Sequence, residues 1–146
     1  MKIRIFYDDI NHRIRRSKEV LKLIEKVIRN KNKTPGDLYF IITTDERLTE
    51  INREFLKKDT LTDVIAFDYS ERNCIKGEVY ISKDTVKRNG HNYKVSLRTE
   101  MVRVMIHGTL HLCGYKDRNE ADRGIMKEEE DFWIMKLKEQ ENGFLL

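Results

Sequence analysis

The sequence has little of the residues that define several large classes of protein. One proline and seven glycines among 146 residues exclude a collagen-like or a proline- and glycine-rich low-complexity chain. Two cysteines are too few for a disulfide framework, so we expect a reducing, cytoplasmic setting. No apolar run approaches the roughly 20 residues that a membrane span needs, so we expect no membrane partner. The N-terminal stretch alternates apolar and charged residues, which is not the pattern of a signal peptide.

Charge, by contrast, is abundant. Charged residues make up 37% of the chain, and 29 basic against 25 acidic residues give a net charge of +4. The basic residues gather in two stretches, over residues 13–33 and 83–103. Either stretch alone is explained by a solvated surface. If both lie on one face, they favour contact with the phosphates of a nucleic acid.

The hydrophobic pattern predicts short strands that alternate with helices. Period-two alternation or short apolar runs predict strands at 2–6, 38–42, 64–67 and 78–81. Apolar residues three and four apart predict helices that begin near residues 17, 45, 82, 96 and 119, the last running to about 140. Pro35-Gly36 predicts a turn, Asn89-Gly90 the end of the third helix, and Phe132 and Trp133 are expected in the core.

This order of elements predicts the fold class. The strands at 64–67 and 78–81 follow one another without a helix between them, so we expect that pair to be antiparallel. The other strands are separated by helices and can pair in parallel. The length is that of one ordinary domain. The sequence therefore predicts a single domain over 1–146 of the α+β class, with a small mixed sheet of about four strands covered by helices.

Two histidines and an aspartate form the most informative pattern. His107 and His111 are four residues apart on a predicted helix, so their rings share one face. Gly114 ends that helix and lets the chain turn, which brings Asp117 within reach. Two imidazoles and a carboxylate leave one tetrahedral position open, as catalytic zinc sites do. A water molecule in that position would become a nucleophile near neutral pH.

A histidine pair at this spacing also occurs simply as two polar helix residues, yet other features favour metal binding. The chain has only four histidines, and this helix is otherwise apolar, so buried histidines need partners. Gly108, between the two, weakens the helix by about 1 kcal/mol, which indicates a close approach to the backbone. Zinc proteases carry a glutamate at the position of Gly108, so we do not expect peptide hydrolysis. Cys113 is expected to be a small buried apolar residue.

Three segments resemble the motifs of one known family. They occur in the family's order and at close to its spacing. His107–Tyr115 follows the pattern H-G-x-L-H-L-x-G-Y-D-H, 59–67 resembles K-D-x-P-T-D-V-L-S-F, and 77–82 resembles G-D-I-x-I-S. The chain thus resembles the YbeY family of bacterial rRNA maturation factors. The resemblance implies a zincin-like metal-binding helix, one zinc ion and a cytoplasmic single-strand-specific endoribonuclease. It also implies ribosomal RNA and the small ribosomal subunit as partners, in 3′-end maturation of 16S rRNA and in ribosome quality control.

Two positions depart from the family pattern. The third histidine of the family falls on Asp117, so the expected ligands are His107, His111 and Asp117. A carboxylate binds zinc but also suits manganese or magnesium, so another divalent metal is possible. The family arginine of Y-R-x-K-D falls on Leu56. We expect Lys57 or, preferably, Lys58 to supply positive charge in its place, with Arg118 as a further candidate, and these join His107 and His111 as predicted catalytic residues.

Two other functions remain open from the sequence. A ribosome-assembly factor that binds RNA around a structural zinc, without catalysis, is favoured by the leucine at position 56. A metal-dependent hydrolase of a small molecule is the third hypothesis. Asp63 is either a turn residue or a group that supports a metal ligand. His91 is expected on a surface loop and would be the substitute ligand if Asp117 does not bind the metal. The general base and the oligomeric state are left open.

Overall fold

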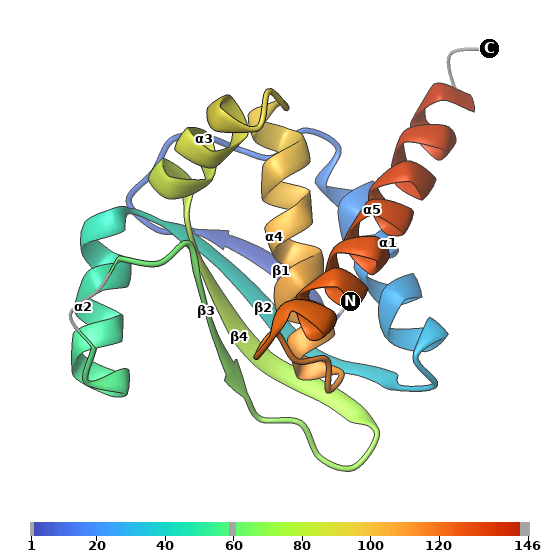
Figure 1. Cartoon of the computed structure of the whole chain (residues 1–146), viewed down its shortest axis with the longest axis horizontal. Helices are drawn as coiled ribbons and strands as arrows, with labels where there is room; N and C mark the ends of the chain where they lie inside the picture. Colours follow the sequence, from blue (N-terminus) through green and yellow to red (C-terminus); the bar gives the residue numbers. More distant parts are fainter. Residues whose placement is uncertain (1, 59–60, 144–146) are drawn as a thin grey trace.

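The computed structural model describes residues 2–58 and 61–143, and within these the chain forms one mixed sheet and five helices (Figure 1). The strands are β1 (Ile3–Tyr7), β2 (Thr34–Thr43), β3 (Val64–Asp68) and β4 (Cys74–Ser82). The helices are α1 (Ser17–Asn30), α2 (Asp45–Leu56), α3 (Lys83–Asn92), α4 (Leu97–Leu112) and α5 (Glu120–Gly143). No helix in this part of the chain has both the length and the apolar character to cross a membrane.

The sheet confirms the predicted fold class. Its four strands lie in the order β1-β2-β4-β3, with β1, β2 and β4 parallel. Strand β3 pairs antiparallel with β4 over the register Val64↔Ile81 to Asp68↔Gly77. A hairpin is possible here because only a short connection separates the two strands, whereas parallel neighbours need a crossover. Strand β3 is therefore an edge strand, and it borders the functional site described below.

The helices cover both faces of the sheet. The main core lies between the sheet and the layer of α1, α4 and α5, with Phe40 and Val79 among its fully buried residues. Helix α2 lies on the opposite face, where Leu48 and Ile51 bury against Ile65 of β3. Figure 1 shows α4 crossing the sheet, and α5 runs beside α1. Since β-strand side chains alternate between faces, one short sheet supports two separate apolar clusters.

Helix α4 carries the predicted metal ligands and is buried along most of its length. The Ser96 hydroxyl caps it by accepting a 3.0 Å hydrogen bond from the Thr99 N–H. The helix ends at Leu112, and Gly114 follows with a φ of 105°, the left-handed region that favours glycine. A Cβ at Gly108 would lie 2.8 Å from Cγ1 of Val79, so α4 and β4 approach closely there. The expected close approach to the Gly108 backbone is thus confirmed.

Two local predictions are wrong, and the end of one helix differs by two residues. Pro35-Gly36 lies inside β2, at a register irregularity between Pro35 and Leu38 that tolerates the missing proline N–H. Phe132 is 46% exposed, because the buried face of α5 is formed by other residues, Trp133 among them. Helix α3 continues past Gly90 to Asn92. The helix starts predicted near residues 17 and 45 are confirmed, with Arg16 and Thr44 at the capping positions.

Candidate metal centre

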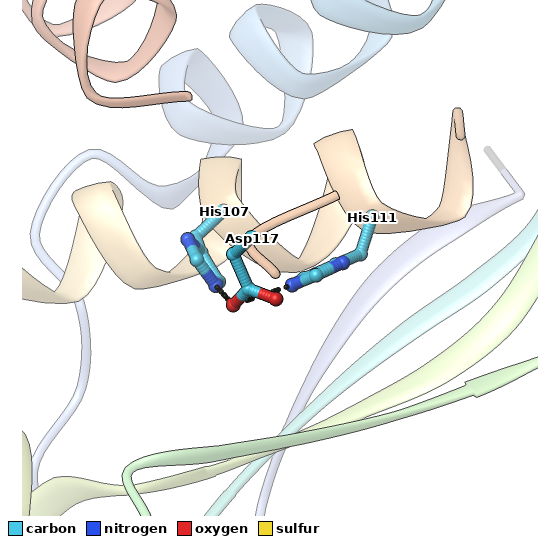
Figure 2. Close-up of side chains that lie close together, drawn as sticks. All are labelled: His107, His111 and Asp117. Carbon is cyan, nitrogen blue, oxygen red and sulfur yellow. Dashed lines mark hydrogen bonds and ion pairs between the residues drawn. The ribbon is translucent and has the colours of Figure 1, made fainter. Parts of the chain in front are cut away.

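The three predicted ligands converge at the C-terminal end of α4. His107 and His111 are one helical turn apart, with ring centroids separated by 4.7 Å. The turn after Gly114 brings Asp117 back against them, as Figure 2 shows. Oδ2 of Asp117 lies 3.3 Å from Nε2 of His111 and 3.7 Å from Nε2 of His107. The chain thus presents two imidazole nitrogens and one carboxylate oxygen to a common point.

This arrangement fits a divalent metal ion. One ligand atom from each residue lies within 4.8 Å of the other two, and no other group of three such side chains with this spacing occurs in the described part of the chain. Nitrogen and carboxylate oxygen ligands suit zinc and also manganese. Three protein ligands leave room for a water molecule or a substrate oxygen. The group can therefore hold a metal ion, in agreement with the prediction from sequence.

Glu130 supports the site from α5, and the sequence interpretation missed it. The residue is 7% exposed, and its Oε2 lies 2.8 Å from Nδ1 of His107. A carboxylate on Nδ1 keeps the proton on that nitrogen and leaves Nε2 free for a metal. Arg103 in turn donates a 3.2 Å hydrogen bond from Nη1 to Oε1 of Glu130. It also forms an ion pair with Asp131, with Nη2 lying 2.8 Å from Oδ1. The sequence carried one signal of this role, because Glu130 is a charged residue within the otherwise apolar buried face of α5.

The charges around His107 determine its affinity for a proton. Burial by itself would lower its pKa, but the hydrogen bond and the charge of Glu130, with the charges of Asp63 and Asp117, raise the pKa above its ordinary value. A metal ion must displace that proton, so metal binding and protonation compete at this ring. The acidic surroundings that raise the pKa also attract a cation.

A cavity of about 590 Å³ opens beside the three ligands. Its lining includes Leu56 and Lys58, from the end of α2 and the residues after it, and the first residues of β3. The structure thus brings Lys58 to the same cavity as the metal ligands. Arg118 lies elsewhere: its side chain is 73% exposed, its Nε is 3.3 Å from Oδ2 of Asp122, and it does not line this cavity. Its catalytic role remains a prediction without geometric support.

Asp63 and Leu56 occupy positions where the sequence left a choice. Asp63 lines the cavity, and its backbone carbonyl accepts a 3.0 Å hydrogen bond from the N–H of Ser82 on β4, so its role as a turn residue or as support for a metal ligand stays a prediction. Leu56 lines the cavity with 44% of its surface exposed, where the family pattern has arginine. Asp59 and Thr60, which begin the second motif, lie outside the described residues. His91 is exposed on α3 and is not part of the metal group.

A family model and the curated relatives agree on one family. The family model described as Endoribonuclease YbeY matches residues 6–138. A relative named Endoribonuclease YbeY from Flavobacterium psychrophilum is 44% identical over 126 residues, which cover 86% of this chain and 90% of the relative. Another of the same name, from Parabacteroides distasonis, is 38% identical over 96% of this chain and 99% of its own length. The solution structure of TM1509 from Thermotoga maritima shares the fold, with a TM-score of 0.68, 23% identity and coverage of 97% of this chain and 92% of that one.

Proposed function

Because the chain belongs to the endoribonuclease YbeY family, we propose that it is a zinc-dependent, single-strand-specific endoribonuclease. Its proposed substrate is ribosomal RNA of the small subunit, in 3′-end maturation and ribosome quality control in the cytoplasm. The observation that carries this proposal is the convergence of His107, His111 and Asp117 at a cavity that also contains Lys58. A structural zinc site would be closed by four protein ligands, whereas this group has three and borders open space.

The residues around the cavity have different proposed roles in the reaction. A divalent ion held by the three ligands would polarise a phosphoryl oxygen and acidify a bound water molecule. Glu130 holds His107 in the tautomer that presents Nε2. Lys58 attracts the phosphate backbone as a point charge, without the paired hydrogen bonds that an arginine makes. Asp63, also in the cavity, is a carboxylate available to accept a proton from the attacking group.

The shape of the site favours unpaired RNA. The metal ligands lie in a cavity between α4 and the edge strand β3, so a scissile phosphate must enter together with its neighbouring nucleotides. In an A-form duplex the base edges are held in stacked pairs and in a deep, narrow major groove. A single strand can instead splay its bases to follow the protein surface. A cavity of this kind therefore favours the single-strand specificity that the family resemblance implies.

The test compares the purified wild type with His111→Ala and Lys58→Ala on a labelled single-stranded RNA, with zinc and separately with manganese. We expect His111→Ala to lose both bound metal and cleavage, and Lys58→Ala to keep the metal but cleave more slowly. The same RNA annealed to its complement should resist cleavage. Unchanged metal content in His107→Ala and His111→Ala, measured by elemental analysis, would refute the assignment of the site. Equal cleavage by all variants would identify a contaminating nuclease.

A second candidate function is favoured by Leu56. This side chain occupies the cavity where the family pattern has an arginine, so the chain lacks one group that would hold the phosphate in a bidentate grip. The alternative is an RNA-binding assembly factor whose metal is structural. Leu56→Arg separates the two, because leucine is partly exposed and arginine can extend toward solvent. A nuclease should cleave faster with arginine, whereas a pure binder should bind RNA with or without it and cleave in neither form.

A further inference from the structure

A second cavity, of about 580 Å³, also borders the metal centre. His107 and Asp117 line both cavities, but the second one is otherwise formed by the connection between α3 and α4, by α4 itself and by α5. The first cavity is bordered instead by β3 and the residues after α2. The metal ligands therefore stand where two cavities meet. An RNA strand whose phosphate reaches the metal would place one neighbouring nucleotide toward each cavity.

The lining of the second cavity suits a nucleotide. Val95 and the buried Met126 contribute apolar surface, and Tyr93 is 66% exposed. An aromatic ring at this position offers a face on which a base can stack. Arg123 and Lys127 add positive charge, and Arg123 also lies 3.4 Å from the carbonyl of Asp117. Apolar surface, an aromatic ring and cations together match the base and the phosphate of one nucleotide.

Glu100 contributes a buried carboxylate to this cavity. The residue is 4% exposed and lines the cavity from the first turn of α4. Its Oε1 is buried and has no hydrogen-bond partner among the described residues; Nε of Arg103, at 3.9 Å, is too far to donate one. Burial raises the pKa of Glu100, with the charge of Arg103 opposing it and the charges of Asp63 and Glu130 adding to it. A buried acceptor without a donor is unfavourable, and a ligand with N–H groups would relieve it.

We propose that this cavity is a subsite that selects guanine in the nucleotide beside the scissile phosphate, with Glu100 as the residue that recognises the base. The inference rests on the proposed function, because it places the guanine next to a phosphate at the metal centre. Guanine presents two adjacent N–H donors, N1–H and N2–H, which match the two oxygens of one carboxylate. Adenine and cytosine present a donor beside an acceptor nitrogen, and uracil presents one donor between two carbonyls. A carboxylate therefore discriminates in favour of guanine.

The first experiment measures binding without catalysis. Metal-free protein is titrated against a labelled short oligouridylate and against the same strand with one central guanine, adenine or cytosine. We expect the guanine strand to bind about tenfold more tightly than the other three. Glu100→Gln should reduce this preference to within about twofold, because an amide opposes one donor with another. Glu128→Gln, exposed on α5 and outside the cavity, is the matched control and should keep the full preference.

Two further results bear on the same subsite. Tyr93→Ala removes the stacking ring. It should weaken the binding of all four RNA strands by about tenfold without changing their order of affinity. This exposed position also provides a test should Glu100→Gln fail to fold, which thermal denaturation reveals. Equal binding of the four strands by the wild type would overturn the proposal. So would a guanine preference that Glu100→Gln leaves intact.

Cleavage assays with zinc and manganese separate this inference from the proposed function. If the wild type cleaves beside the guanine and Glu100→Gln cleaves elsewhere or not at all, the result supports both the nuclease function and the guanine subsite. Cleavage that is indifferent to the guanine supports the nuclease and overturns the subsite. Guanine-dependent binding with no cleavage under either metal supports the subsite and counts against the nuclease.

Discussion

Replacing Gly108 by alanine tests how α4, the helix that carries His107 and His111, lies on the sheet. Inside a helix this change normally stabilises a protein by about 1 kcal/mol, because glycine has the greater backbone freedom to lose. Here the new Cβ would lie 2.8 Å from Cγ1 and 3.3 Å from Cγ2 of Val79. Val79 is fully buried in β4, and a β-branched side chain has little rotamer freedom with which to withdraw. Either α4 or β4 must therefore shift.

The magnitude follows from these two opposing effects. Overpacking of a core by one methyl group destabilises by roughly 1–3 kcal/mol. After the helix-propensity gain, we expect Gly108→Ala to lower the free energy of unfolding by about 0–2 kcal/mol. Gly108 lies between His107 and His111 on the same helix, so a shift of α4 also moves the ligands. Metal affinity should fall together with stability.

The assay is denaturant unfolding of the metal-free protein in a chelator, with a double-mutant cycle. Val79→Ala alone removes two buried methyl groups and should destabilise by about 2 kcal/mol. In the double variant the alanine at 108 occupies part of the vacated space, so the two effects should be less than additive by about 1–3 kcal/mol. Gly124→Ala is the matched control, because no atom lies within 4 Å of a Cβ there, and it should stabilise by about 1 kcal/mol. The reasoning is refuted if Gly108→Ala stabilises as much as Gly124→Ala, or if the cycle is additive.

Three other predictions concern the site and its surroundings. Glu130→Gln should weaken metal binding by about 10–100-fold in a chelator-competition assay, because the ring of His107 loses its carboxylate support; a matching loss in Glu128→Gln would contradict this. Asp117→His should shift the preference toward zinc over manganese, read from the ratio of the two dissociation constants, and an unchanged ratio would show that Asp117 is not a ligand. Burial raises the pKa of the Cys113 thiol to about 11, so little thiolate forms near neutral pH; in a Cys74→Ser variant, alkylation near pH 8 should be on the order of 100-fold slower than for a free thiol, and a normal rate would show that Cys113 is accessible.

The features that depend on neighbours along the chain were predictable from the sequence. A spacing of four residues places His107 and His111 on one face of any helix, whatever that helix packs against. Gly114 ends the helix through its left-handed backbone, so Asp117 has only a short turn to cross. The hairpin of β3 and β4 likewise follows from a connection too short for a crossover. The grouping of His107, His111 and Asp117 and the mixed sheet were predictable for this reason.

Which distant residues join His107, His111 and Asp117 depends on how the helices and the sheet pack together. Glu130 meets His107 because α5 lies across α4, and the phase of α5 also exposes Phe132 while it buries Trp133. A buried stripe and an exposed one are hard to tell apart in a helix that carries apolar residues on several sides. The two cavities likewise depend on how α5 and β3 border α4, so neither Lys58 nor Glu100 has a position relative to the metal until the chain is folded. Periodicity determines which face of an element a residue occupies, whereas the packing of whole elements determines what that face meets.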